Sequence, residues 1–401
     1  MEVLSMVRLS SSPLPLLLLS AAALTLASCG GSGGASGPGI PRVSSGADAV
    51  SLLPALSRQR DTDTSRDTDA DDGVAVLRQL DDIITIGSTV DPQNGDQNPY
   101  GLDVARVDAD QIETGDLVVC NFNNAANVQG TGTTIVALHP RPGSTPLRIA
   151  AREELLGCDA LALAPNDNIW AAAFADNDNP IVSPSRGLLT SLDQGPWHGP
   201  FGQTFAAHPG PFGIAAFYES NAGNGSIVRI DILSGGGFRF DVIATGFAVN
   251  HGAPGSILGP SGLQYDAKHD RLYIVDGADN TLVAFRHVST IPAGGIVVNG
   301  GTFSGPFAHR ARLVFSGAPL NGPISSALLP NGHLVLGNTL DPNGQNLMVE
   351  ITANGRVLAI KNVDTGLGAA LFGMVAAGRS LGDLKLYFND DNDNTVKALT
   401  H

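Results

Sequence analysis

The feature that most constrains this chain is a unit that recurs six times between residues 98 and 399. Each copy has an opening motif, an apolar strand, a polar turn, a second apolar strand, an Asn/Asp/Gly-rich loop and a third strand. The clearest copy is GPSGLQYDAKHDRLYIVDGADNTLVAF at 259–285. Short runs rich in β-branched and aromatic residues, bounded by turn residues, predict strands. A unit of this size cannot bury its own apolar faces, so repeated copies must stack on one another.

The fourth position of the opening motif is small in every copy. The residues are Gly101, Ala160, Gly202, Gly262, Ser325 and Gly373, in motifs that begin near 98, 157, 199, 259, 322 and 370. We interpret this regularity as the close approach of strands that converge on a central axis. A fourth apolar strand follows several copies, for example FRFDVIAT at 238–245. Four antiparallel strands repeated six times around an axis predict an all-β fold, a six-bladed β-propeller.

The two ends of the repeat array predict how the ring closes. The sixth copy ends at Leu399 and leaves no room for its own fourth strand, whereas an unassigned apolar strand, IITIG at 83–87, precedes the first copy. We expect 83–87 to pair as the outer strand of the last blade. The propeller is then predicted to span 73–401.

The strand–loop–strand pattern LYIVDGADNTLVAF at 272–285 resembles the NHL repeat and the related SMP-30-like propellers. The resemblance extends over all six copies and implies the propeller fold. SMP-30-like hydrolases hold a divalent metal in the central funnel with a carboxylate, typically Glu, and with Asn/Asp residues. The resemblance therefore implies such a metal site here. This chain departs from that pattern, because Asp159 is the only acid in an opening motif and no Glu occurs in one.

The N-terminal part predicts export. Residues 1–28 contain Arg8 and a short apolar run, and they end in Leu26-Ala27-Ser28 before Cys29. This pattern resembles a bacterial lipoprotein signal in which Cys29 is lipidated; the alternative is an ordinary signal peptide with an incidental cysteine. Residues 29–72 are Gly/Ser-rich and then Asp/Thr/Arg-rich, which predicts a disordered tether. We therefore expect a cell-envelope lipoprotein, periplasmic or outer-membrane anchored, that meets the membrane through its lipid only.

The net charge limits the possible partners, and the number of cysteines limits the possible disulfides. The formal net charge is −15, and such a surface repels phosphate backbones, so we expect no nucleic acid partner. With Cys29 lipidated, Cys120 and Cys158 remain, an even number in an oxidising compartment. Cys120 ends a strand of the first blade and Cys158 opens the second blade. Either they form a disulfide or they are two separate buried thiols.

One face of the predicted propeller is the candidate binding face. The loops that open each blade and the loops between second and third strands lie on this face, and they are long. The candidate residues are Tyr100, Asp159, Trp197, His198, Asn250, His251 and Asn321. The Asn/Asp loops themselves predict structural turns, because these residues tolerate left-handed backbone conformations. Two weaker alternatives are calcium held by Asp390, Asp391 and Asp393 or by Asp176 and Asp178, and zinc held by histidines from different blades.

The sequence contains no nucleophile elbow, phosphate-binding loop or dinucleotide motif. The leading hypothesis is therefore a non-enzymatic module, without a resident cofactor, that binds a protein, peptide or glycan through the long-loop face. The alternative is a metal-dependent hydrolase or lyase of the SMP-30/NHL kind, with Asp159, His198, His251 and Asn321 in the funnel.

Overall fold

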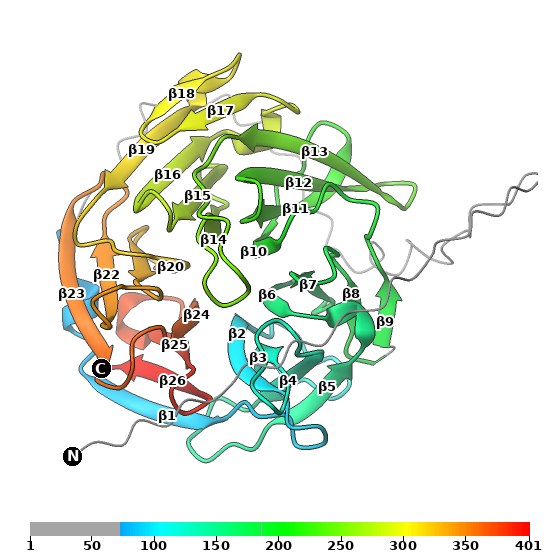
Figure 1. Ribbon diagram of the computed structural model, residues 1–401, viewed down its shortest axis with the longest axis vertical. Coiled ribbons are helices and arrows are strands. Elements are labelled where there is room, and N and C mark those ends of the chain that lie inside the picture. The colour runs from blue at the N-terminus through cyan, green and yellow to red at the C-terminus, as the bar shows by residue number, and fades with distance from the viewer. Residues whose placement is uncertain (1–72, 186) are drawn as a thin grey trace, which may run out of the picture. The chain divides into compact units, whose positions relative to one another are not determined.

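Six antiparallel sheets surround a central axis in the computed structural model of this protein (Figure 1). The structure describes residues 73–185 and 187–401. The predicted six-bladed propeller is confirmed, whereas the predicted signal, Cys29 and the tether at 29–72 lie outside the described residues.

Each blade has four antiparallel strands arranged from the axis outward, and in blades 1, 2, 3 and 5 these four are consecutive in sequence. Blade 1 contains β2 (Gln97–Val104), β3 (Leu117–Asn123), β4 (Thr134–Leu138) and β5 (Leu147–Ala151). Blade 2 contains β6 (Cys158–Leu163), β7 (Ile169–Ala173), β8 (Ile181–Ser183) and β9 (Gly187–Thr190). Blade 3 contains β10 (Pro200–Ala206), β11 (Gly213–Asn221), β12 (Ser226–Leu233) and β13 (Phe238–Thr245).

The remaining blades repeat this order. Blade 4 contains β14 (Pro260–Asp266), β15 (Arg271–Asp276), β16 (Thr281–Arg286) and β19 (Ala311–Ser316). Blade 5 contains β20 (Ser325–Leu328), β21 (Leu334–Gly337), β22 (Asn346–Ile351) and β23 (Val357–Asp364). Blade 6 contains β24 (Leu371–Ala377), β25 (Lys385–Asp390) and β26 (Thr395–Thr400), and β1 (Asp82–Ser88) is its outer strand. Ile83 lies opposite Leu399, so the ring closes as the sequence predicts.

Blade 3 has two strands that the repeat does not predict. The hairpin of β17 (Ile296–Asn299) and β18 (Thr302–Ser304) belongs in sequence to the long connection inside blade 4. It instead extends the sheet of blade 3, because β17 pairs in parallel with β13. The sheet of blade 3 therefore has six strands, and the hairpin bridges two neighbouring blades.

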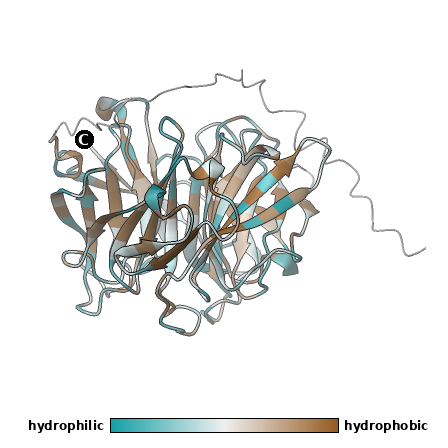
Figure 2. Ribbon diagram, turned by 90° about the horizontal axis from the view of Figure 1, so that it is seen from above, coloured by the Kyte–Doolittle hydropathy of each residue, from teal (hydrophilic) through white to brown (hydrophobic). Residues whose placement is uncertain are grey.

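The apolar core is divided among the interfaces between blades. One cluster joins Cys120 and Leu163 across blades 1 and 2, and another joins Trp170 and Phe217 across blades 2 and 3. Equivalent clusters fill the other interfaces, including that between blade 6 and blade 1. Figure 2 shows hydrophobic residues concentrated in the strands and hydrophilic ones toward the loops. Each sheet thus hides its two faces against its neighbours, as stacked repeat units require.

Only short 3-10 helices interrupt the strands in the described residues. They are η1 (Val76–Arg78), η2 (Glu153–Leu155), η3 (Val288–Thr290), η4 (Ala308–Arg310) and η5 (Leu381–Asp383). Within residues 73–185 and 187–401, no helix has the length and apolar character that crossing a bilayer requires. Helix η1 docks on blade 5, because Glu350 accepts hydrogen bonds from the backbone N–H groups of Val76 and Leu77 at 3.1 and 2.8 Å.

Candidate functional site

The innermost strands of all six blades line a central channel. Its hollow has a volume of about 530 Å³, part of which is open to solvent, and the six small residues of the opening motifs lie along it. A Cβ added to Gly101 would lie 2.8 Å from the backbone of Ala160, so the small residues allow each innermost strand to approach the next. A β-bulge beside the small residue, in every blade but the fifth, adjusts the direction of the lining side chains.

On the long-loop face, aromatic side chains narrow the channel. Tyr100 is stacked between Phe122 and Phe372, with ring centroids 4.2 and 3.8 Å away. The 250–258 loop, which precedes blade 4, projects over the middle of the ring (Figure 1). It reaches blade 1 on the opposite side, since a Cβ on Gly130 would lie 3.2 Å from Pro254. Access to the channel from this face is therefore restricted.

Two buried carboxyl groups interact electrostatically across the interface of blades 2 and 3. Asp159 from β6 is 4% exposed and Glu219 from β11 is fully buried. Burial raises the pKa of Asp159 well above its usual range, the Glu219 charge raises it further, and the nearby N–H groups of Asp159 and Ala160 oppose the shift. Burial likewise raises the pKa of Glu219, against a 2.9 Å hydrogen bond from the Asn179 amide. Burial thus opposes the ionisation of both groups.

Several neighbouring polar atoms have no hydrogen-bond partner within the described protein. They are both carboxylate oxygens of Asp159, Oε1 of Glu219, Oδ1 of Asn179, and both amide atoms of Gln203. Gln203 lines the channel and lies opposite Glu219 in the β10–β11 pair. These atoms are oxygens, which can act as metal ligands, and one amide nitrogen. Among the residues described, however, no three His, Cys, Asp or Glu side chains are grouped as a metal site would need.

The predicted site residues do not form one cluster. Tyr100 and Asp159 both line the channel. Trp197 is 5% exposed and packs in the core of blades 2 and 3, where its indole N–H donates to Leu192 O at 2.6 Å, so it belongs to the interior rather than to the exposed face. His198 is exposed at the loop face.

The remaining candidates stabilise loops. Asn250 caps the 250–258 loop, because its Oδ1 accepts hydrogen bonds from the N–H groups of Gly252 and Leu258. His251 is exposed in the same loop. The Asn321 amide donates to Asp341 Oδ1 at 2.7 Å.

The Asn/Asp loops between second and third strands have a structural role at three blade junctions. Asn177, Asn280 and Asn394 adopt left-handed backbone conformations, and each Oδ1 accepts a 2.7 Å hydrogen bond from the first residues of the next blade. Three of the five acids considered for calcium, Asp178, Asp390 and Asp393, are also engaged. The Lys397 ammonium contacts Asp390 and Asp393, and Asp178 accepts hydrogen bonds from Ser191 and Leu192.

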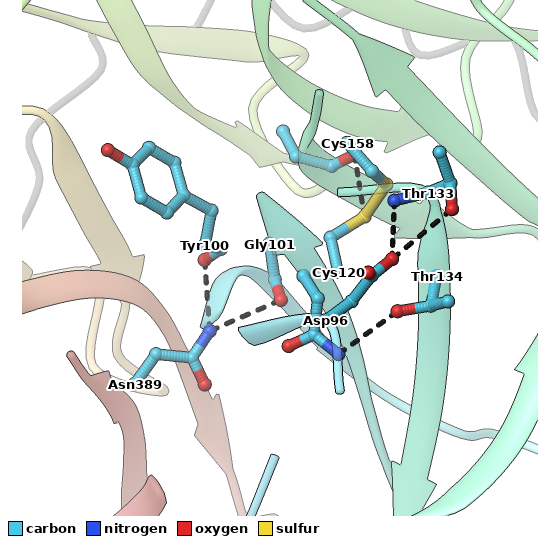
Figure 3. The surroundings of a disulfide bond; sticks show 10 residues. Asp96, Tyr100, Gly101, Cys120, Thr133, Thr134, Cys158 and Asn389 are labelled. Atoms are coloured by element: carbon cyan, nitrogen blue, oxygen red, sulfur yellow. Dashed lines mark hydrogen bonds between the residues drawn. A yellow bond between two sulfur atoms is a disulfide. The ribbon is translucent and has the colours of Figure 1, made fainter. Parts of the chain in front are cut away.

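Blades 1 and 2 are joined covalently. The structure contains a disulfide between Cys120 and Cys158, whose Cα atoms are 5.4 Å apart (Figure 3). On the other side of blade 1, the Asn389 amide of blade 6 donates to the carbonyl oxygens of Tyr100 and Gly101 at 2.9 and 3.2 Å. The disulfide thus fixes the strand that carries Asp159, and Asn389 fixes the strand that carries Tyr100.

A groove on the long-loop face is the second candidate site. The space over it is about 840 Å³, part of which is open solvent, and three loops line it through Ser256, Leu258, Leu340, Asp341, Pro342, Gly344, Leu367, Gly368 and Ala369. Leu367 is 81% exposed. Its backbone is nevertheless fixed, because the amides of Asn346 and Asn392 donate to its carbonyl oxygen at 2.8 and 3.0 Å.

Sequence reasoning missed Glu219, Gln203 and Leu367. Glu219 lies in an apolar second strand, AAFYES, and that setting signals burial. Its position beside Asp159 depends on the stacking of blade 3 on blade 2, which the opening motif alone does not reveal. Leu367 lies in a Gly-rich loop without periodicity, so no sequence signal distinguishes it.

No family model matches the sequence, and no curated protein matches it. Solved structures do show similarity. A structural genomics protein of unknown function from Bacteroides thetaiotaomicron has a TM-score of 0.50 at 8% identity, over 79% of this chain and 74% of that one. A catalytically inactive virginiamycin B lyase from Staphylococcus aureus with quinupristin has a TM-score of 0.46 at 15% identity, over 80% and 85%. A chain of a nidogen/laminin complex has a TM-score of 0.49 at 13% identity, over 74% and 98%. At these identities the similarity concerns the propeller fold alone.

Proposed function

We propose that this protein is a membrane-tethered binding module that presents its long-loop face to a partner in the cell envelope. The groove beside Leu367 is the observation that carries the proposal. Leu367 is 81% exposed there beside Leu258, Leu340 and Pro342, and apolar side chains gathered on an exposed surface are typical of sites that a partner covers. The loops around the groove are fixed by hydrogen bonds, so little ordering entropy opposes binding there.

The tether supports this orientation. Cys29 in its lipoprotein-like setting is the proposed anchor, with 29–72 as the spacer. Helix η1 is bound to Glu350, and Glu350 also contacts His333 Nδ1 at 2.9 Å in the turn between β20 and β21. That turn belongs to the face opposite the long loops. The described chain therefore enters the propeller on the far face, which leaves the long loops accessible to a partner.

Site-specific photo-crosslinking tests this proposal. A photoreactive amino acid is placed in the full chain at Val128 or Leu367 on the loop face, and at Phe212 in the turn between β10 and β11 on the opposite face. These side chains are 49, 81 and 60% exposed, so all three can react. Irradiation of cells that make the protein is expected to yield a discrete polypeptide adduct from the loop face only. Adducts from Phe212 alone, or from no position, would contradict the proposal.

A metal-dependent hydrolase or lyase of the SMP-30/NHL kind is the second candidate, favoured by the Asp159–Glu219 pair. Carboxylate and amide oxygens are the donors that Ca²⁺ and Mg²⁺ prefer, and Asp159, Glu219, Asn179 and Gln203 supply them. A bound metal would act as a Lewis acid. Metal analysis of the purified protein, with melting before and after chelation, tests this. A stoichiometric metal that is lost in Asp159→Asn would favour the enzyme; a metal-free protein that melts identically with chelator would exclude it.

A further inference from the structure

Four arginines gather on the far face of the propeller, where blades 4 and 5 meet. In blade 4, Arg271 of β15 lies opposite Arg286 of β16, so both side chains are on one face of the sheet. Arg312 of β19 is on the same face, because it lies opposite Ala284, two residues before Arg286. This face packs against blade 5. We call Arg271, Arg286, Arg312 and Arg356 of blade 5 the arginine cluster.

Contacts between the two blades bring Arg356 to the other three arginines. The Arg312 guanidinium donates to Ala353 O at 2.6 Å, in the turn that ends with Arg356. A Cβ added to Gly355 would lie 2.1 Å from Val314 O, so this turn is in close contact with β19. Blades 4 and 5 adjoin along the outside of the ring (Figure 1). The turn thus places Arg356 beside the arginines of blade 4.

Arg286 and Arg312 carry charge that the described protein does not neutralise. Both side chains are exposed. Their guanidinium groups donate to the carbonyl oxygens of His309 and Ala353, and within residues 73–185 and 187–401 neither forms an ion pair. A guanidinium has five N–H donors in a planar fork, so each retains donors for a carboxylate. The cluster therefore offers charge-assisted hydrogen bonds to an anionic partner.

The acids in the adjacent turn of blade 4 have other contacts. Asp266 lies opposite Arg271 in the β14–β15 pair, but its carboxylate contacts His269 Nδ1 at 2.5 Å. Asp270 accepts a 2.7 Å hydrogen bond from the Ser289 hydroxyl. No Asp or Glu occurs at 286–290, 305–312 or 352–356. On a chain with a net charge of −15, the cluster is a localised positive surface.

An acidic stretch of the same chain ends at the cluster. Residues 61–72, DTDTSRDTDADD, contain six Asp and one Arg. The described chain begins directly after them at Gly73, and a Cβ added to Gly73 would lie 3.1 Å from the Arg356 guanidinium. A chain of this length can extend over about 40 Å, well beyond the roughly 10 Å that separates β15 from β19. Because the segment is attached there, its effective concentration at the cluster is on the order of millimolar.

We propose that residues 61–72 bind the arginine cluster of their own chain, with Asp carboxylates paired to Arg286, Arg312 and Arg356. Charge complementarity selects this occupant, and attachment at Gly73 favours it over the same segment of a second copy. The inference goes beyond the proposed function, since it holds whatever binds the loop face.

Binding of the segment would set the length of the tether. The part free to span between the proposed anchor and the propeller becomes 29–60 instead of 29–72. High salt or a competing polyanion should release the segment and lengthen the tether, because the contacts are between exposed charges.

Photo-crosslinking of the purified full-length protein tests where the segment binds. A photoreactive amino acid replaces Ala70 inside the segment, or Ser45 outside it as the control. Ala70 is expected to give intramolecular crosslinks to the peptides that carry the four arginines, and Ser45 to give none there. Mass spectrometry of the digested products identifies the crosslinked peptides.

Limited proteolysis measures the dependence on charge. Trypsin cleaves after Arg66 inside the segment and after Arg58 before it. The double variant Arg286→Gln/Arg312→Gln should speed cleavage after Arg66 about three- to tenfold at low salt and leave cleavage after Arg58 unchanged. Salt at about 0.5 M should raise the rate in the unmodified protein toward that of the variant. Arg141→Gln, at an exposed arginine on the far face of blade 1, is the matched control and should have no effect.

An unchanged rate in the double variant, or crosslinks from Ala70 that miss blades 4 and 5, would overturn the inference. Crosslinked dimers without intramolecular products would overturn it too, and would show that the cluster holds the segment of a second copy. If the double variant weakens binding to anionic vesicles while cleavage after Arg66 stays the same, the cluster contacts lipid phosphate and the inference fails. None of these results depends on crosslinking at the loop face, so failure here leaves the proposed function intact.

Discussion

Gly202 illustrates how single residues set the spacing between blades. It lies in the innermost strand of blade 3, and an added Cβ would overlap the carbonyl oxygen of Ser261 in blade 4. Backbone atoms cannot move aside without shifting a whole strand, so we expect Gly202→Ala to lower the free energy of unfolding by roughly 3 kcal/mol. Gly235→Ala is the control, because nothing lies within 4 Å of its added Cβ, and it should change stability by less than about 0.5 kcal/mol. Urea unfolding compares them; equal effects would show that the blades are not in such close contact.

Asp391 makes stability depend on pH. Burial and the Asp390 charge raise the pKa of Asp391 to about 6, from 3.8 in the unfolded chain. The stability associated with its neutral form is fully present below about pH 4 and is lost as pH rises through 6. The full shift would correspond to about 3 kcal/mol, which partial exposure reduces to roughly 2 or less.

Asp391→Asn should therefore stabilise the protein at pH 7.5 and have little effect near pH 4. Urea unfolding at the two pH values measures this, with exposed Asp82→Asn as the control. A pH-independent gain would show that the charge of Asp391 is not the cause.

At the scale of elements, a buried arginine holds the extra hairpin on blade 3. Arg229 in β12 is 1% exposed and pairs with Asp231 and Asp241 at 3.1 and 2.7 Å. Its guanidinium also donates to the carbonyl oxygens of Ser289 and Ile291, which precede the β17–β18 hairpin. One side chain thus joins the connection inside blade 4 to the sheet of blade 3.

Truncation of Arg229 should leave Asp231 and Asp241 buried without their partner. We expect Arg229→Ala to cost roughly 3–5 kcal/mol and to increase amide hydrogen exchange in 288–304. Arg239→Ala is the matched control, because Arg239 also pairs with Asp241 but is 45% exposed. This variant should lower the free energy of unfolding by less than about 1 kcal/mol. Similar losses for the two variants, or unchanged exchange in the hairpin, would contradict this role.

The disulfide links blades 1 and 2 across 38 residues of chain. A cross-link of this loop length restricts the unfolded chain, so reduction is expected to lower stability by roughly 2–4 kcal/mol. Chemical unfolding with and without reductant measures the loss, with the Cys120→Ala/Cys158→Ala variant as a reductant-insensitive control. Mass spectrometry showing both cysteines alkylatable in denatured, unreduced protein would reject the bond.

At the scale of the whole molecule, the ring depends on the pairing of β1 with β26. Ile86 in β1 is 3% exposed and packs with residues of blades 6 and 1, whereas Ile83 in the same strand is 45% exposed. We expect Ile86→Asn to lower the free energy of unfolding by roughly 3 kcal/mol, because the variant buries an amide at the closing junction. The melting temperature should fall accordingly. Ile83→Asn should have a small effect. Calorimetry distinguishes the two, and similar melting temperatures would show that closure does not limit stability.

The sequence by itself determined the number of blades, their strand order and the strand that closes the ring. These properties follow from hydrophobic alternation, turn residues and small residues such as Gly101 and Gly373, which recur with the repeat. The structural role of Asn177, Asn280 and Asn394 was also predictable, because left-handed turns favour Asn locally.

Only the tertiary structure decided where the non-repeating parts lie. It brought Glu219 near Asp159, and it buried Trp197 while exposing Leu367. It paired the β17–β18 hairpin with blade 3, although the hairpin lies in sequence within blade 4. It also carried the 250–258 loop across the ring to blade 1. Each of these contacts links distant segments that share no period. Local patterns report how a segment folds against its own neighbours, whereas the partner of an insertion is chosen by packing across the ring.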